Sequence, residues 1–184
     1  MKRLSSVVWL IGVAAALACA HPNDRPQATP SHFEIDIPAG WQKHNTNKFF
    51  LIYKNDPLRQ YILVQERPLD RPFKFSNKSL QAGMRPQEVA SVVIDELRSD
   101  KQLLTLAVIE NAPATIQGND GCRILFTYGL GDGSNYKTLY YGFIRNGSYF
   151  SLRFNTAADQ DFERDLQAFG QVVDSLRFLA AAPV

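Results

Sequence analysis

The residues of this sequence that could carry out chemistry are few, and they lie far apart. The three histidines, His21, His32 and His44, do not have the spacing of a zinc motif such as H-E-x-x-H, and no G-x-S-x-G motif is present. A catalytic triad needs a positioned histidine, and His44 lies in the polar segment Q-K-H-N-T-N, where we expect it to be solvated. We therefore expect no catalytic residues, no metal site and no cofactor.

Two further patterns resemble functional sites and have simpler explanations. Glu34 and Asp36 alternate along one expected strand, so they share a face and could do acid–base work. Alternate acidic residues are, however, typical of a solvated or edge face. The segment G-L-G-D-G-S, residues 129–134, suggests a phosphate loop, but strand residues follow it instead of a helix. We interpret it as a hairpin loop.

The N-terminus has the features of a secretory signal peptide. Lys2 and Arg3 precede the apolar run Val7–Ala18, which is shorter than the ~20 residues that a membrane-spanning helix needs. We therefore expect residues 1–18 to be a signal peptide. Residues 19–31 are rich in proline and almost free of apolar side chains after Ala20, which predicts a flexible tether.

Three processing sites compete at the end of the apolar run. Small residues allow a cut before Cys19 or before His21, and Leu17-Ala18-Cys19 resembles the lipobox of bacterial lipoproteins, although the favoured leucine is one position late. Cysteine usage favours lipidation of Cys19, because a secreted domain that depends on disulfides carries an even number of cysteines. The only other cysteine, Cys122, is then a free thiol, which we interpret as a small buried hydrophobe near the start of a strand.

Lipidation at Cys19 predicts an exported protein that is anchored through its N-terminal lipid to the periplasmic side of a bacterial envelope. Residue Ala20 follows the cysteine where an aspartate would favour retention, so the resemblance to Gram-negative sorting implies the outer membrane if the host has one. The alternative is a soluble periplasmic or secreted protein.

The length and charge of the chain fit one neutral domain. The 184 residues are enough for a single hydrophobic core, which we place at residues 32–178, followed by a tail at 179–184. The 20 basic residues exceed the 18 acidic ones by two, which is the number that Lys2 and Arg3 supply. Without a signal peptide the chain has no net charge, which argues against nucleic acid as a partner.

The hydrophobic pattern predicts an α+β fold with a mostly antiparallel sheet and helices packed on its faces. Pro86 and Glu88 mark the start of a first helix that ends near Asp100, and Pro113 is expected to break a strand. A capping box from Thr156 to Asp159 predicts that a second helix begins there and continues to Leu176. The expected strands are 33–37, 49–54, 61–66, 104–110, a short piece at 114–117, 123–128, 136–145 and 148–154.

Eight aromatic residues in the last three strands have two interpretations. They could form the core, or they could form an exposed strip that binds a protein or an apolar ligand. We expect the core, because strands favour aromatic residues in any case. The eight are Tyr128, Tyr136, Tyr140, Tyr141, Phe143, Tyr149, Phe150 and Phe154.

Three segments carry a family resemblance: F-E-I-D-I-P-A-G-W at 33–41, G-M-R-P-Q-E-V-A at 83–90 and F-E-R-D-L-Q-A-F-G-Q-V-V-D-S-L-R-F at 162–178. With them, residues 32–178 resemble the PsbP-like α/β/α sandwich superfamily, and within it the bacterial envelope lipoproteins of the DcrB type. The resemblance implies an antiparallel sheet with helices on both faces and an accessory or binding role. It transfers no catalytic or metal-binding residues to this chain.

These patterns lead to three functional hypotheses. The first is a non-catalytic, membrane-anchored envelope protein that binds another envelope protein or component through its sheet surface or through the loop at 67–83. The second is a secreted carrier of an apolar small molecule, for which a deep dry pocket would be the sign. The third is an enzyme of unrecognised type, for which a pocket with clustered buried ionisable groups would be the sign.

Overall fold

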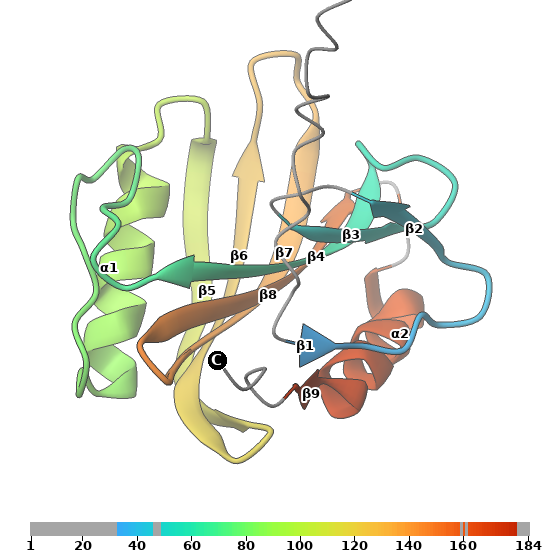
Figure 1. Cartoon of the computed structure of the whole chain (residues 1–184). Helices are drawn as coiled ribbons and strands as arrows, with labels where there is room; N and C mark the ends of the chain where they lie inside the picture. Colours follow the sequence, from blue (N-terminus) through green and yellow to red (C-terminus); the bar gives the residue numbers. More distant parts are fainter. Residues whose placement is uncertain (1–32, 46–48, 159, 161, 180–184) are drawn as a thin grey trace, which may run out of the picture.

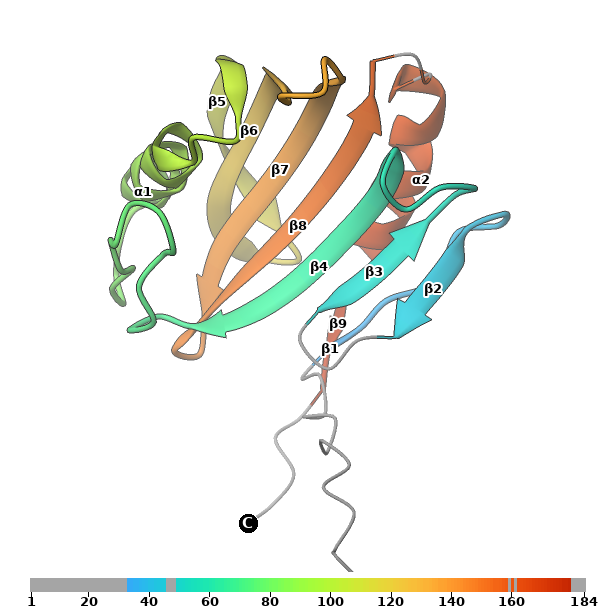
Figure 2. The same ribbon diagram turned by 90° about the horizontal axis from the view of Figure 1, so that it is seen from above.

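The chain is described by a computed structural model that covers residues 33–45, 49–158, 160 and 162–179. Its centre is a seven-stranded sheet in which every neighbouring pair is antiparallel, in the order β2-β3-β4-β8-β7-β6-β5 (Figures 1 and 2). The strands are β2 (Gln42–Asn45), β3 (Phe50–Tyr53), β4 (Gln60–Pro68), β5 (Leu104–Ile116), β6 (Asn119–Gly129), β7 (Asn135–Arg145) and β8 (Ser148–Ala157).

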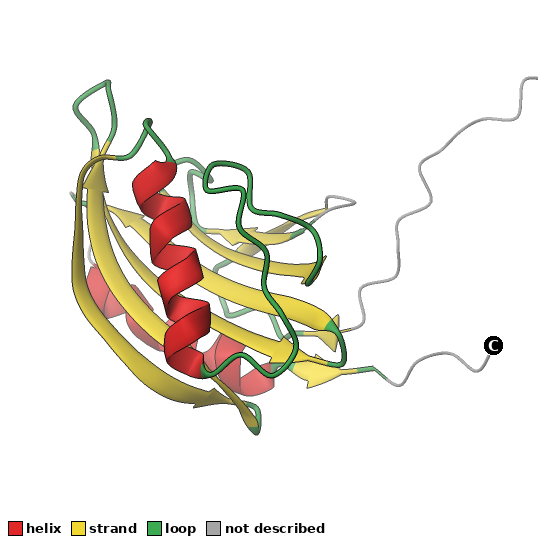
Figure 3. Cartoon of the chain, turned by 90° about the vertical axis from the view of Figure 1, so that its left-hand side faces the viewer, coloured by secondary structure: helices red, strands yellow, loops and turns green. Residues whose placement is uncertain are grey.

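Two helices and a second, two-stranded sheet complete the fold. Helix α1 (Pro86–Ser99) joins β4 to the edge strand β5, and helix α2 (Phe162–Ser175) follows β8. The small sheet pairs β1 (Phe33–Glu34) with β9 (Arg177–Phe178), which brings the two ends of the described chain together. Figure 3 shows α1 in front of the large sheet and the other helix behind it. The predicted α+β class, with an antiparallel sheet covered on both faces, is confirmed.

Strand β8 illustrates how alternation divides the core into two layers. Phe150, Leu152 and Phe154 belong to the layer on the α2 side, together with Phe169 and Val172 of that helix. Tyr149 points to the other side, where the core contains Val89, Val93 and Leu97 of α1 with Ile124 and Phe126 of β6. Because successive residues of a strand point to opposite faces, Ser151, Arg153 and Asn155 also lie on the α1 side.

Two turns and one helix start behave as the sequence predicts. Asn146 and Gly147 form the β7–β8 turn with φ of 48° and 77°, the left-handed values that this dipeptide tolerates. The G-L-G-D-G-S segment is the β6–β7 hairpin loop, closed by a hydrogen bond from Leu130 N to Ser134 O. At the start of α1, Pro86 occupies the first turn and the Glu88 carboxylate accepts a hydrogen bond from Arg85 N at 2.7 Å.

The predicted start of the second helix is wrong. Thr156 is buried inside β8, paired with Gln60 of β4 and Lys137 of β7, and α2 begins at Phe162. Residues of β8 have a hydrogen-bonded strand on each side, so extension of the ladder outweighs a local capping signal. Asp159, the other member of the expected capping box, lies outside the described residues.

The predicted break at Pro113 is also wrong, because β5 continues through it from Leu104 to Ile116. Pro113 is paired with Cys122 of β6, and β5 is the outermost strand of the sheet. A proline lacks an N–H group, which an edge strand tolerates on its unpaired side. Two elements were not predicted, β2 and β9, and β1 is shorter than the expected strand at 33–37.

Candidate functional site

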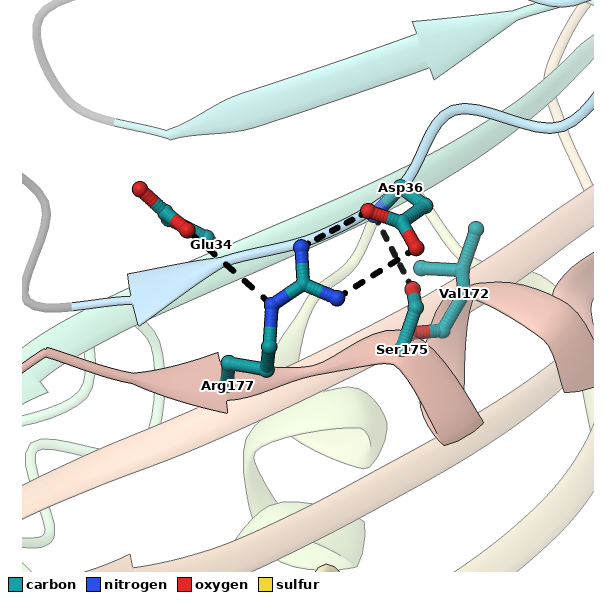
Figure 4. Close-up of polar contacts among 5 residues, drawn as sticks. All are labelled: Glu34, Asp36, Val172, Ser175 and Arg177. Carbon is teal, nitrogen blue, oxygen red and sulfur yellow. Dashed lines mark hydrogen bonds and ion pairs between the residues drawn. The ribbon is translucent and has the colours of Figure 1, made fainter.

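Glu34 of β1 and Asp36, which follows that strand, are part of a structural clasp (Figure 4). Arg177 of β9 lies between the two acids: its Nη2 is 2.7 Å from Asp36 Oδ1, and its Nε is 4.0 Å from Glu34 Oε2. The Asp36 N–H donates to Ser175 Oγ at 3.0 Å, and that hydroxyl donates to Val172 O. The hydrogen bonds from Arg177 hold the pKa of Asp36 below its ordinary value. These exposed acids therefore tie β1 to the end of α2, in line with the solvated-face interpretation.

The other candidate side chains from the sequence are dispersed. His44 is exposed, as expected, but it lies in strand β2 and not in a loop. Cys122 is a free thiol that is only 1% exposed, so its interpretation as a small buried residue is confirmed, and burial raises its pKa to about 11. Cys19, His21 and His32 lie outside the described residues. In the described part of the chain, no three His, Cys, Asp or Glu side chains gather where they could hold a metal ion.

Most of the aromatic residues of the last strands are in the core. Tyr140, Phe143, Tyr149, Phe150 and Phe154 are buried, and the Tyr140 and Tyr149 hydroxyls are hydrogen-bonded to each other at 2.6 Å. The remaining three, Tyr128, Tyr136 and Tyr141, are half-buried. The core interpretation thus holds for five of the eight, and Tyr128 leads to a feature that the sequence analysis missed.

A polar cluster lies under α1, where the sheet would be expected to be apolar. Asn155 of β8 is 1% exposed, and its Oδ1 accepts hydrogen bonds from Tyr128 Oη at 2.9 Å and Thr138 Oγ1 at 2.6 Å. Its Nδ2 is buried and has no hydrogen-bond partner in the described structure. Burial also raises the pKa of Tyr128, so its hydroxyl stays protonated and remains a donor.

Arg153 lies two residues before Asn155 and therefore projects from the same face of β8. Its guanidinium is 5.6 Å from the centre of the Tyr140 ring and is hydrogen-bonded to the Tyr61 side chain. The Nε atom is buried without a hydrogen-bond partner, and no ion pair found among the described residues includes Arg153. Arg153 as a whole is half-buried, and a partly desolvated guanidinium normally has a carboxylate partner, so this one is unusual.

Both orphan donors belong to residues that line one cavity, which we call the Arg153 pocket. It has a volume of about 160 Å³ and lies between the C-terminal half of α1 and strands β6, β7 and β8. The sheet contributes Phe126, Tyr128, Thr138, Arg153 and Asn155, and the opposite wall consists of Phe75, Glu96, Leu97, Asp100 and Leu103.

A second cavity of about 280 Å³ lies at the end of the sheet, beside the β6–β7 hairpin, and Tyr128 lines both cavities. Here Tyr128 stacks on Tyr136 with ring centres 5.2 Å apart, and Lys137 pairs with Glu163 at 3.0 Å. Lys137 already has a carboxylate partner, so the described residues of this cavity offer a ligand no unpaired cation of the kind found in the Arg153 pocket. The Arg153 pocket is therefore the candidate functional site.

The sequence contained one overlooked signal for this site. In S-Y-F-S-L-R-F-N-T-A, residues 148–157, the alternate positions Ser151, Arg153 and Asn155 are polar although β8 is a central strand. Buried polar residues in a central strand need hydrogen-bond partners. Had the strand order been known, the three polar positions would have indicated a buried polar site. The contributions of Phe75 and Glu96 could not be found in this way, because they depend on how loop 69–85 folds against α1.

Sequence comparisons and structural comparisons give different results for this chain. The sequence matches no protein-family model, and it matches no curated protein. Three solved structures share its fold at low sequence identity. Cyanobacterial PsbP (CyanoP) from Synechocystis is 14% identical with a TM-score of 0.58, and the match covers 82% of this chain and 88% of that chain.

The other two structures come from different proteins. LpqN of Mycobacterium tuberculosis, described as involved in cell envelope biogenesis, is 15% identical with a TM-score of 0.51, and the match covers 80% of this chain and 83% of that one. A variant of the protein Mog1 is 8% identical with a TM-score of 0.54, and the match covers 80% of this chain and 91% of that one. At these identities the matches establish the fold alone and leave the DcrB-type assignment a prediction. The chain has the PsbP-like fold.

Proposed function

We propose that this chain is a non-catalytic, lipid-anchored accessory protein of the bacterial cell envelope that binds another envelope component. The observation that carries the proposal is the junction A-L-A-C-A at 16–20, where a signal-like apolar run meets a cysteine and a proline-rich segment. A PsbP-like domain follows it, and one protein with this fold, LpqN, is described as involved in cell envelope biogenesis. Among the described residues, no helix is both long and apolar enough to cross a membrane.

The cavities favour this binding role over the carriage of an apolar molecule. Pockets that enclose drug-sized ligands usually have volumes of about 300–1,000 Å³ and mostly apolar walls. The Arg153 pocket, at about 160 Å³, is smaller, and a guanidinium and an amide form part of its wall. Such a site suits recognition of a small polar group.

The chemistry of the pocket also favours binding over catalysis. Tyr128 has a raised pKa because it is buried, so at neutral pH its hydroxyl does not act as a base. Arginine stays protonated in proteins and serves as a donor. The groups that converge there therefore hold a ligand in place, and none of them is a ready nucleophile.

The anchoring part of the proposal can be tested by fractionation. The full-length protein and the Cys19→Ala variant are expressed in a bacterial host, and the mass of the mature N-terminus is measured. We expect wild-type protein in the membrane fraction with an acylated Cys19, because several acyl chains are needed for stable anchoring. The variant should leave that fraction. Recovery of soluble wild-type chain that begins at an unmodified His21 would contradict lipidation and establish plain secretion.

The binding part is tested by capture from detergent-solubilised envelope after mild cross-linking, with the anchored wild-type protein as bait. A partner should be captured by wild type and lost when the pocket is altered by Arg153→Met. Arg145→Met serves as the matched control, because Arg145 lies at the end of β7 over the Phe178 ring and does not line the pocket. Equal capture by all three proteins would place the binding surface elsewhere.

A further inference from the structure

The Arg153 pocket contains a cation that forms no ion pair with the described residues. Arg153 has the Tyr61 side chain and the Tyr140 ring as neighbours, and neither is a carboxylate. Its Nε–H has no acceptor in the described structure. A partly desolvated charge without an ion-pair partner costs stability, which makes Arg153 a candidate for ligand binding.

Asn155 provides a second donor beside the first. Because Tyr128 and Thr138 both donate to its Oδ1, the amide is held with its NH₂ group directed away from them. Its Nδ2 has no acceptor, and the side chain is almost completely buried. Residues i and i+2 of a strand lie ~7 Å apart on one face, so a group with two acceptor oxygens that binds the Arg153 guanidinium lies beside Asn155.

The remaining wall of the pocket defines the size and character of the bound molecule. Phe126 on the sheet and Leu97 and Leu103 on the other side are apolar. A dry cavity of about 150 Å³ is known to hold benzene, so a pocket of about 160 Å³ has room for an apolar body of roughly that size.

The acids in the pocket wall restrict the charge of the ligand. Glu96 accepts hydrogen bonds from Phe75 N and Ser76 N, and the Asp100 Oδ1 accepts one from Gln102 N, so both carboxylates are held in place by backbone groups. Two negative charges near the cavity repel a dianion more strongly than a monoanion. A carboxylate is therefore favoured over a phosphate.

We propose that the Arg153 pocket binds a small monocarboxylate, with its two oxygens on Arg153 and Asn155 and its apolar body against Phe126 and Leu97. The proposal gives a ligand class to the proposed binding function, and it holds whether or not Cys19 is lipidated. Loop 69–85 covers one side of the pocket through Phe75, which Glu96 holds in position.

The test uses benzoate as the probe and calorimetric titration of the purified mature protein. Two analogues separate charge from shape: benzamide has the same ring without the charge, and phenyl phosphate carries a second negative charge. We expect saturable binding of benzoate, and at least tenfold weaker binding of both analogues. Equal affinity for benzamide, tighter binding of phenyl phosphate, or no heat of binding for benzoate would each overturn the proposal.

Arg153→Met tests the residue itself and gives a second readout. The variant should lose at least tenfold in benzoate affinity, while its Tm without ligand should rise, because an apolar side chain replaces a partly buried charge that forms no ion pair. Arg145→Met should keep the affinity of the wild type. If Arg153→Met keeps its affinity, or if its Tm falls while binding is retained, Arg153 is a structural residue and the proposal fails. A failed fractionation test at Cys19 would leave this result unaffected.

Discussion

Lys54 and Asp165 form an ion pair that joins the end of β3 to the first turn of α2, with Lys54 Nζ 2.9 Å from Asp165 Oδ1. Asp165 is buried, and Gln60 and Arg164 donate to its other oxygen, each at 2.8 Å. Burial alone would raise the pKa of this carboxyl, but the hydrogen bonds from Arg164, Lys54 and Gln60 lower it to about 2. A charged residue thus fixes the position of a helix whose other contacts with the sheet are mainly apolar.

The first prediction concerns acid stability. The pKa of Asp165 is lower in the folded protein than in the unfolded chain, so the ionised carboxylate stabilises the fold above an ordinary Asp pKa and loses this effect as the pH falls toward 2. The ionised Asp165 carboxylate contributes about 2 kcal/mol to the free energy of unfolding at neutral pH. Asp165→Asn should therefore be less stable than wild type at pH 7, and the difference should shrink between roughly pH 4 and pH 2. Urea unfolding across this range measures it, and a difference that is independent of pH would refute the assignment.

The second prediction concerns the apolar face of α2. Phe169 is 1% exposed and stacks on Phe154 and Tyr141, with ring centres 5.7 Å away in both cases. Phe169→Ala should lower the free energy of unfolding by about 3–5 kcal/mol, because it leaves a cavity in the core. The measurement is urea unfolding of a soluble form that starts at Ser31. Leu58→Ala is the control, since Leu58 is 77% exposed and its loss should change stability by less than about 0.5 kcal/mol.

The third prediction concerns Cys122. Burial raises its pKa to about 11, and only the thiolate reacts with disulfide reagents, so the native protein should be labelled very slowly at neutral pH. Labelling should become complete and fast once denaturant unfolds the chain. The measurement compares the rates of thiol labelling with and without denaturant, and rapid labelling of the native protein would show that the side chain is accessible.

The fourth prediction contrasts Gly142 of β7, which is closely packed, with Gly170 of α2, which has open space around it. A Cβ on Gly142 would collide with the Tyr149 hydroxyl, which is hydrogen-bonded to Tyr140, whereas a Cβ on Gly170 would meet no atom within 4 Å. Gly142→Ala should therefore destabilise the protein by about 1–3 kcal/mol. Gly170→Ala, in the middle of α2, should stabilise it by up to about 1 kcal/mol. Thermal unfolding of both variants tests the pair, and effects of the same sign would argue against the packing around Tyr149.

The elements with strong local signals were predictable from the sequence. Helix α1 begins at Pro86 with Glu88 in its capping position, and the β7–β8 hairpin turns at Asn146-Gly147, because short-range sterics and hydrogen bonds determine both features. The antiparallel arrangement followed from the many short connections between strands. These signals need no knowledge of which strands become neighbours.

The errors arose where a non-local partner decides the structure. Thr156 looks like a helix cap until two strands flank it, and Pro113 looks like a break until its strand is known to be the edge. No local pattern in the sequence indicates that Asp165 is buried, because its partners Lys54 and Gln60 lie more than a hundred positions earlier in the chain. The Arg153 pocket was missed for the same reason, since its walls come from two loops, one helix and three strands.

The pairing of β1 with β9 has a consequence for how the chain could be reconnected. Phe33 is the strand partner of Phe178, so the two ends of the fold lie about one strand spacing apart. A short peptide linker could join them, and new termini could be opened in the turn at Asn146-Gly147, whose Gly147 has open space around it. Such a circular permutant would keep every strand pair of the seven-stranded sheet while moving its termini from the β1–β9 clasp to the β7–β8 turn.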